Sequence, residues 1–401
     1  MNFIQRRWLI ILGAIGLHIS IGSVYAWSVF TNPIMTYLNC SLSEVQFAFS
    51  LAIFFLGTTA AFFGKFIEKY GPKKSGLIAA CFFAAGMIGG GISVYYHALI
   101  GLYISYGMIG GIGLGIAYLA PVSSLIKSFP EHKGFAAGVA IMSFGFGAAV
   151  CGPVANMLMS IMPVYTTMIV MGIAYFIVMI LASMIFTKMP NISKEAYMNG
   201  FTRKEAMKTK TFYKLWFMLF FNIFAGIAII ATMSPIAQEL ISVSVSQAAG
   251  IVGLVGIFNG LGRIVIPIIS DKFGRKLVYS SVYIAELIAF SILLMNPTYI
   301  TFQIAMYILA AGYGAGFALI APYAADVFGT RNVGSIHGAI LFSWGIAGVF
   351  APMLLAFIHS ITGSFVNIFY VNIVILITAF IISVTVSKEY IVDKSEDIEE
   401  D

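Results

Sequence analysis

The stretch NGLGRIVIPIISDKFGRK, residues 259–276, contains the two features that decide the fold. Its second half, DKFGRK, is a short charged turn that belongs in water. Its first half is an apolar run that contains a single cation, Arg263. An ionised side chain is costly in the hydrocarbon layer of a membrane and is found there mainly where it has a function or a partner.

The composition is that of an integral membrane protein. Of the 401 residues, 60% are apolar and only 9% are charged, whereas soluble proteins carry about 25% charged residues. The net charge of +6 comes from basic residues in short loops between apolar runs. This pattern describes membrane topology and not a nucleic-acid partner.

Several classes of protein are excluded by the motifs that the sequence lacks. The three cysteines, Cys40, Cys81 and Cys151, are far apart and odd in number, so a disulfide framework is not expected. The glycine-rich GGIGLG at 110–115 lies inside an apolar run with no strand before it, which indicates helix packing and not dinucleotide binding. We expect no metal, no cofactor and no enzymatic activity.

Twelve apolar runs are long enough to cross a membrane as helices, which requires about 20 residues each. They are 8–30, 44–66, 75–95, 99–125, 134–157, 164–187, 214–237, 246–270, 277–296, 299–325, 335–358 and 364–387. The first run is too long for the core of a signal peptide, so we interpret it as a retained span. The sequence therefore predicts an all-α integral membrane protein with twelve transmembrane helices.

The basic residues predict the orientation of these spans. With twelve spans, 21 of the 22 lysines and arginines lie on the side of the membrane that holds both termini. Cytoplasmic loops carry the excess of basic residues, so we expect both termini in the cytoplasm and the protein in the cytoplasmic membrane. The remaining basic residue is Arg263.

The chain also repeats itself after about 200 residues. GKFIEKYGPKK at 64–74 corresponds to PIISDKFGRK at 267–276, and GIGLGIAYLAP at 111–121 corresponds to GYGAGFALIAP at 312–322. We predict two pseudo-symmetric six-helix bundles, 1–187 and 214–387, a basic cytoplasmic linker at 188–213 and an acidic tail at 388–401. Parallel halves of this kind are typical of secondary transporters, which bind substrate between the halves.

Two of the loops resemble motif A of the major facilitator superfamily. The matching residues are Gly64, Glu68, Lys69, Gly71 and Lys73 in the first half and Asp271, Lys272, Gly274 and Arg275 in the second. Pro267 stands where the second copy of the motif would begin with glycine. The resemblance implies the twelve-helix fold of that superfamily. We expect the glycines to permit tight turns and the charged residues to pair with neighbouring helix ends in a gate.

A second set of motifs resembles the oxalate/formate antiporter family. These are GSVYAWSVF at 22–30, the GIAYLAP stretch around Tyr118, Phe129-Pro130, Lys133-Gly134 and NGLGR-x7-DKxGR. This family includes transporters of monocarboxylates such as lactate or pyruvate. An arginine on its eighth helix binds the substrate carboxylate, and Arg263 occupies that position. Members that carry oxalate add a lysine on the eleventh helix, where this chain has Trp344.

The chemistry of Arg263 agrees with this resemblance. Guanidinium is a planar fork that binds a carboxylate with two hydrogen bonds and stays charged when buried. Asn259 lies one helical turn earlier on the same face. Candidate walls of the cavity are Tyr25, Tyr118 and Trp344. The alternative is that Arg263 extends to the cytoplasmic surface, since Asp271 is only eight residues away, or that it pairs with an acid.

Proton coupling requires a titratable group within the spans. The candidates are Glu286, His18 and His337. The alternatives are a neutral, hydrogen-bonded Glu286 and histidines that serve packing, which is the more common role of a lone histidine, and the substrate itself can carry the proton.

The predicted function is secondary active transport of a small carboxylate, most directly a monocarboxylate, by proton symport or anion exchange with alternating access. Exchange of oxalate or another dicarboxylate is the alternative within the same class. A transporter-like anion sensor is the alternative of another class, although the longest loop is too short for an output domain. The expected partners are the carboxylate, protons and the lipid bilayer, with a monomer as the functional unit.

Overall fold

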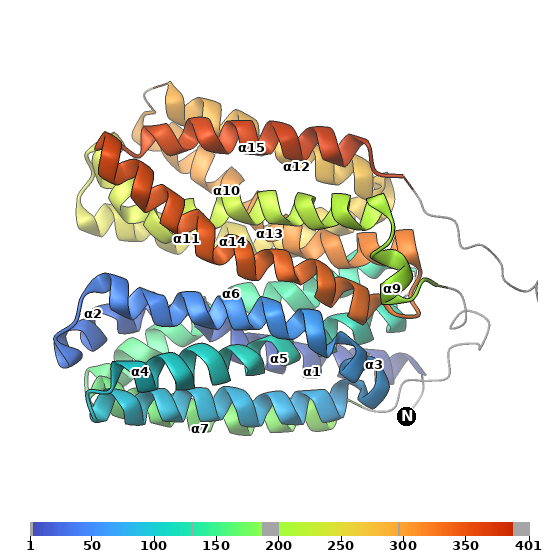
Figure 1. The fold of residues 1–401 in the computed structure, drawn as a ribbon, viewed down its shortest axis with the longest axis horizontal. Coiled ribbons are helices and arrows are strands. Elements are labelled where there is room, and N and C mark those ends of the chain that lie inside the picture. The colour runs from blue at the N-terminus through green and yellow to red at the C-terminus, as the bar shows by residue number, and fades with distance from the viewer. Residues whose placement is uncertain (1–2, 130, 187–199, 296, 388–401) are drawn as a thin grey trace, which may run out of the picture.

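The computed structural model describes residues 3–129, 131–186, 200–295 and 297–387, and the elements in these ranges are helices (Figure 1). In chain order they are α1 (Phe3–Gly22), η1 (Ser23–Ala26), α2 (Trp27–Leu38), α3 (Leu42–Tyr95), α4 (Leu99–Leu102), η2 (Tyr103–Gly110), α5 (Gly111–Ser128), α6 (Lys133–Met159), α7 (Val164–Ile185), α9 (Arg203–Ala206), α10 (Lys210–Ile241), α11 (Val245–Phe273), α12 (Arg275–Leu294), α13 (Tyr299–Phe328), α14 (Val333–Thr362) and α15 (Val366–Val384). The segment η1 is a 3-10 turn and η2 is a π-helical segment.

The helices confirm the predicted all-α membrane fold. Within the described part of the chain, eleven helical segments are long and apolar enough to cross a membrane. The seventh predicted span, 214–237, falls within α10 (Lys210–Ile241), which is not among those eleven. The second and third predicted spans lie in α3, which is interrupted at Gly71 by a backbone with φ of 76°. A positive φ suits glycine, so this residue marks the turn between two membrane helices.

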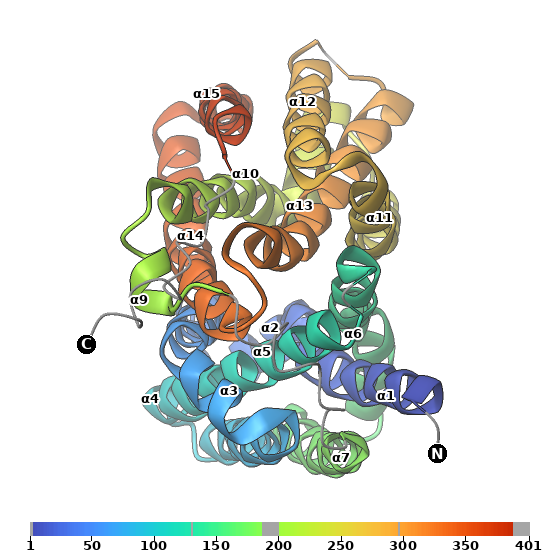
Figure 2. The ribbon, with the colours of Figure 1, turned by 90° about the vertical axis from the view of Figure 1, so that its right-hand side faces the viewer.

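The helices form two bundles that lie side by side. Helices α1 to α7 make one half of the molecule and α10 to α15 make the other (Figure 1). Seen along the membrane-spanning direction, α6 lies next to α11 and α3 lies next to α14 (Figure 2). These two pairs of helices are therefore the main contacts between the halves.

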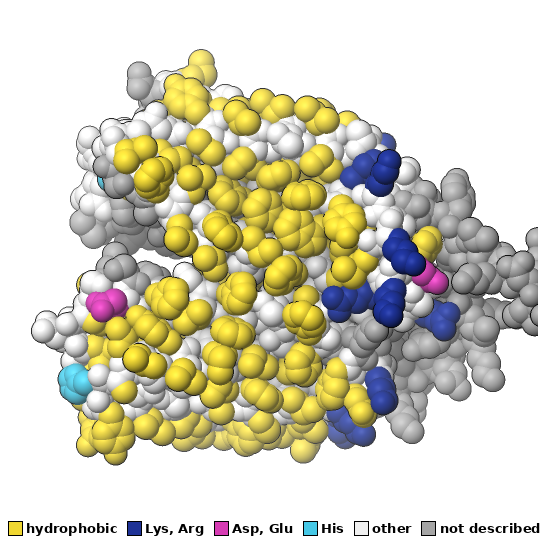
Figure 3. Space-filling model, viewed as in Figure 1, with side chains coloured by type: hydrophobic (Ala, Val, Ile, Leu, Met, Phe, Trp, Pro, Cys, Tyr) yellow, Lys and Arg dark blue, Asp and Glu magenta, His cyan; other side chains and the backbone are white. Residues whose placement is uncertain are grey.

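The surface separates into an apolar girdle and one basic end. Exposed apolar side chains cover the flank of both halves, whereas lysines and arginines gather at the end where α3 turns and α11 ends (Figure 3). Exposed side chains such as Leu181, Phe350 and Ile381 suit a surface that faces hydrocarbon. We call the end that carries Lys69, Lys272 and their neighbours the basic end.

Glycines bring the two halves into backbone contact toward the basic end. A Cβ atom built on Gly57 would lie 2.6 Å from the Gly345 nitrogen, and one on Gly64 would lie 2.5 Å from the Cα of Ser335. On the other seam, a Cβ on Gly138 would lie 2.8 Å from the Arg263 carbonyl oxygen. At the opposite end a notch in the surface separates the halves (Figure 3). The structure is thus closed at the basic end.

The described part of the linker contacts both halves at the basic end. The Phe201 amide donates to the Phe328 carbonyl at 2.9 Å, and the Asn332 side-chain amide donates to the Phe201 carbonyl at 3.0 Å. The Arg203 guanidinium, at the start of α9, donates to the Ala61 carbonyl in the other half. The predicted linker residues 188–199 and the predicted tail 388–401 lie outside the described residues.

Candidate substrate-binding site

Arg263 lies on α11 between the two halves and its side chain is fully buried. Its Nε donates to the Asn259 side-chain oxygen at 2.9 Å, and its Nη1 donates to the Ile141 carbonyl of α6 at 3.5 Å. Asn259 in turn donates to the Ala310 carbonyl of α13 at 3.3 Å, which fixes its orientation. Because the side chain is held inward, it does not reach the surface at the basic end.

Two phenyl rings flank the Arg263 guanidinium. Its central carbon lies 5.6 Å from the ring centre of Phe144 on α6 and 5.3 Å from that of Phe317 on α13. Aromatic faces attract a cation within about 6 Å. The two rings come from different halves of the molecule, so the guanidinium lies at the seam between them.

Tyr118 of α5 and Trp344 of α14 complete the enclosure. Their ring centres are 5.5 Å apart, and Trp344 also lies 4.5 Å from Phe317. These three side chains, together with those of Phe144 and Arg263, are buried. We call Tyr118, Phe144, Arg263, Phe317 and Trp344 the cage.

Three hydrogen-bond donors of the cage are left without a protein partner. Among the described residues, Arg263 Nη2, the Tyr118 hydroxyl and the Trp344 Nε1 form no well-aligned hydrogen bond. Arg263 also has no ion pair with any described Asp or Glu. A buried donor without an acceptor costs about 1–3 kcal/mol. The cage therefore encloses a cation together with hydrogen-bond donors that have no acceptor among the described residues.

Tyr25 borders the cage beside Arg263. Its ring packs against Phe144 at 5.1 Å between centres, and its hydroxyl lies 3.2 Å from the Tyr313 hydroxyl of α13. This hydroxyl pair joins the two halves.

Two of the three candidates for proton coupling lie beside the cage, and the third lies apart from it. His18 and His337 are buried beside Tyr118, with ring-centre distances of 5.5 Å and 6.2 Å. Nε2 of His18 also lies 3.2 Å from the Tyr118 carbonyl oxygen. Glu286 lies on the far side of α13, where its Oε1 accepts from Asn222 at 3.3 Å. A Cβ on Gly312 would meet Glu286, whereas one on Gly314 would meet Arg263, so α13 separates the two.

The second copy of motif A forms a latch between the halves at the basic end. The two carboxylate oxygens of Asp271 accept from the backbone amides of Gly134 and Phe135 at 2.9 Å and 3.0 Å. These amides belong to the first turn of α6, where an acid is also favoured by the helix dipole. Arg275 pairs with Asp271 and, at 3.0 Å, with Asp326. We call Asp271, Arg275, Asp326 and the first turn of α6 the latch.

Glycines make room for the latch and its turn. A Cβ on Gly134 would lie 2.7 Å from both Asp271 Oδ1 and Arg275 Nη1. Gly274 adopts a φ of 91°, which only glycine accepts readily. In the first copy of motif A, Gly64 packs against α14 and Lys69 and Lys73 are exposed, as Lys272 is in the second. The side chain of Glu68 lies outside the described residues.

The sequence did not identify Phe144, Phe317, Tyr313 or Gly134 as site residues. The repeat contains a signal for Phe144, because Ser143 and Ser343 correspond at a separation of 200 and the next residues are Phe144 and Trp344. Both rings enter the cage from equivalent helices of the two halves. The roles of Phe317 and Tyr313 depend on how α13 is rotated, which no local motif shows.

Two bundles of membrane helices with a buried arginine at their seam form an architecture that is typical of secondary transporters. The family model described as the Major Facilitator Superfamily matches residues 10–352 and 215–399. The chain belongs to this superfamily, so it is a secondary transporter and not an enzyme.

Individual relatives agree with this assignment. The chain is 27% identical over 353 residues to the uncharacterized MFS-type transporter YhjX of Escherichia coli, with 87% of each chain covered. It is 25% identical over 363 residues to the oxalate:formate antiporter of Oxalobacter formigenes, covering 87% of this chain and 84% of the relative. Its fold is similar to that of the transporter FucP in the outward conformation, with a TM-score of 0.74 at 13% identity over 95% of this chain and 99% of the other.

Proposed function

We propose that the protein transports small monocarboxylates, with the carboxylate bound by Arg263. The observation that carries this proposal is the unpartnered Nη2 of Arg263 in a cage whose Tyr118 hydroxyl and Trp344 Nε1 are also unpartnered among the described residues. A carboxylate has two oxygens that can accept from the guanidinium and from one of these donors. Binding would therefore satisfy groups that the empty protein leaves unsatisfied.

The charge and lining of the cage favour a monoanion. Arg263 is the cation of the cage, and the other walls are the aromatic rings of Phe144, Phe317 and Trp344. A short alkyl or keto group fits such walls. A second carboxylate would be buried against aromatic rings without a cation of its own, which is unfavourable by several kcal/mol. The relative from Oxalobacter formigenes is named for oxalate and formate, which supports small carboxylates as the substrate class.

Alternating access would take place by rocking of the halves about the cage. In this proposal the basic end is cytoplasmic, and the latch of Asp271 with the first turn of α6 holds that end closed. Opening it requires the Asp271 carboxylate to leave the amides of Gly134 and Phe135. Arg263 contacts both halves, so the contacts of an anion bound there would change with the relative position of the halves.

A substrate panel in proteoliposomes tests the proposal. Protein reconstituted with internal lactate should take up labelled lactate or pyruvate by counterflow. Oxalate should compete at least about 100-fold more weakly, because its second charge is not compensated in the cage. Runs with and without an imposed pH gradient separate proton symport from exchange. Exchange of oxalate as fast as lactate would reject the monocarboxylate proposal and leave a dicarboxylate carrier.

Replacing Glu286 with Gln should leave transport nearly unchanged. The glutamine carbonyl can still accept from Asn222, and a neutral side chain suits a site in which the acid has no cation among the described residues. We expect rates of exchange and pH-driven uptake within about twofold of the wild type. Loss of pH-driven uptake with intact exchange would instead assign proton coupling to Glu286. The histidines beside Tyr118 are better placed for that role.

A further inference from the structure

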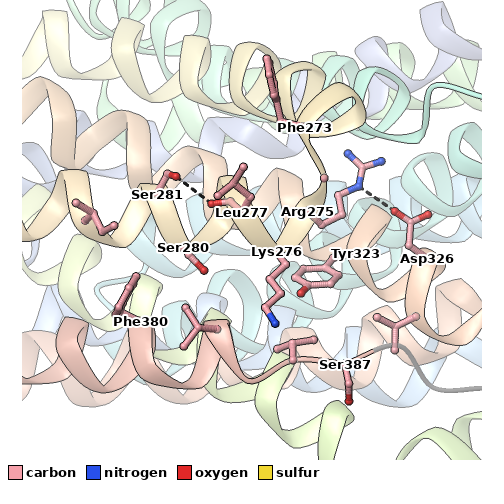
Figure 4. Close-up of a pocket in the computed structure, with 15 residues that line it drawn as sticks. Phe273, Arg275, Lys276, Leu277, Ser280, Ser281, Tyr323, Asp326, Phe380 and Ser387 are labelled. Carbon is pink, nitrogen blue, oxygen red and sulfur yellow. Dashed lines mark hydrogen bonds and ion pairs between the residues drawn. The ribbon is translucent and has the colours of Figure 1, made fainter.

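A groove that is separate from the cage opens at the basic end between α12, α13 and α15. Its volume is about 1090 Å³ (Figure 4). Leu277 and Ile284, which line it, are 60% and 45% exposed, so the groove borders the outer surface of the molecule. The cage residues do not line it.

The groove lies alongside a contact between α12 and α15. The hydroxyl oxygens of Ser280 and Ser383 lie 2.7 Å apart and hold the two helices together. One residue later α15 ends at Val384, and the Lys214 ammonium of α10 donates to the Thr385 carbonyl at 2.6 Å. The chain after α15 is thereby tied to α10, and the space between α12 and α15 stays open.

The lining of the groove is amphipathic. Apolar side chains, Leu277, Ile284, Phe380 and Val384, form its sides. Lys276 lies at the basic end and extends from α12 toward the segment after α15 (Figure 4).

The charges in the groove leave one lysine uncompensated. Arg275 and Asp326 also line it, but they are paired with each other at 3.0 Å. Lys276 is exposed and forms no ion pair with a described residue. Its ammonium therefore supplies the unbalanced positive charge at the mouth of the groove.

We propose that this groove binds one anionic phospholipid from the leaflet at the basic end. Its phosphate would bind Lys276, and an acyl chain would lie along Leu277, Ile284 and Phe380. A lipid fits better than a soluble anion, because the apolar sides run along the surface that faces hydrocarbon, whereas the cation is placed at the level of the headgroups. The groove adjoins the latch, since Arg275 takes part in both. This proposal does not depend on the identity of the transported substrate.

Native mass spectrometry of the delipidated full-length protein in detergent tests the proposal. Phosphatidylglycerol and phosphatidylcholine with the same acyl chains are the two probes. The wild type should retain one phosphatidylglycerol in preference to phosphatidylcholine. Lys276→Ala should weaken that binding about fivefold, the effect of one lysine near an anionic surface. The matched control is Lys272→Ala, an exposed lysine four residues earlier that does not line the groove.

Three results would overturn the proposal. Equal loss in the Lys276 and Lys272 variants would mean general attraction of anionic lipid to the basic end. Equal binding of the two lipids would mean apolar filling only. About 10 mM inorganic phosphate would occupy a site of millimolar affinity. If it displaces phosphatidylglycerol, the groove is a site for a free anion.

A truncation tests the remaining competitor for the groove. Ser387 lines it, and the acidic residues 393–401 follow in the chain. If phosphatidylglycerol binds the protein only after residues 389–401 are removed, the acidic tail is the occupant and the proposal fails. Binding that is the same with and without those residues supports it.

Discussion

Replacing Arg263 with lysine should weaken substrate binding strongly although the positive charge is retained. The guanidinium uses Nε to bind Asn259 and Nη1 to bind Ile141, and it still has Nη2 for an anion. Lysine has a shorter side chain and an ammonium group in place of the planar guanidinium fork. It therefore cannot bind Asn259 and a carboxylate in the geometry that arginine provides. The loss of one or more charge-assisted hydrogen bonds corresponds to binding weaker by on the order of 10- to 100-fold. Quenching of tryptophan fluorescence by lactate measures the affinity, since Trp344 lies in the cage.

The matched control for this variant is Arg203→Lys. Arg203 is also an arginine that donates to a backbone carbonyl, but it lies in the linker and outside the cage. It should keep the affinity of the wild type. If Arg263→Lys binds lactate as tightly as the control does, the anion site lies elsewhere. Arg263→Ala, which removes the cation altogether, should bind no better than the lysine variant.

Replacing Gly64 with leucine should arrest the carrier with its basic end open. A single Cβ at this position would already lie 2.5 Å from the Cα of Ser335 and 3.0 Å from the Gly334 carbonyl oxygen. These are backbone atoms, so the contact cannot be relieved by a change of rotamer, and α3 has to move away from α14. Counterflow should fall to the level of empty liposomes. Spin labels at the exposed positions 73 and 272 should report a longer distance across the basic end.

Two other glycine variants make this result interpretable. Gly256→Leu places the same side chain on α11 where a Cβ would meet nothing within 4 Å, and it should transport as the wild type does. Gly64→Ala should be intermediate, since it adds only the Cβ. A Gly64→Leu protein that exchanges lactate normally would show that the α3 and α14 contact is not needed for closure.

The fold could be predicted because hydrocarbon imposes strong rules on sequence. Long apolar runs and the one-sided distribution of lysine and arginine are required in each span and loop, so they can be counted without knowing the packing. Arg263 could be identified for the same reason, as the cation that broke the rule. Its partner Asn259 followed from helical spacing.

The rest of the site depends on packing that local sequence does not specify. Whether Phe317 or its neighbours face Arg263 is set by the rotation of α13 against α11, where Gly314 meets Asn259 and Arg263. In the sequence, Glu286 and Arg263 are both ionisable residues inside apolar runs. In the structure they lie against opposite faces of α13, so they do not meet. The sequence predicted that the charged turn pairs with a neighbouring helix end but not with which one, because the donors, the backbone amides in the first turn of α6, are 137 residues away from Asp271 in the chain.

The positive charge of Arg263 also predicts how the carrier responds to a voltage across the membrane. When the cage is empty, opening first to one side and then to the other moves a net positive charge through part of the membrane potential. One full charge is worth about 2.3 kcal/mol per 100 mV. With a monocarboxylate bound, the same movement carries no net charge. If the substrate is a monocarboxylate, as proposed, voltage acts on the empty carrier and not on the loaded one, and we expect exchange to be insensitive to voltage and one-way flux to depend on it.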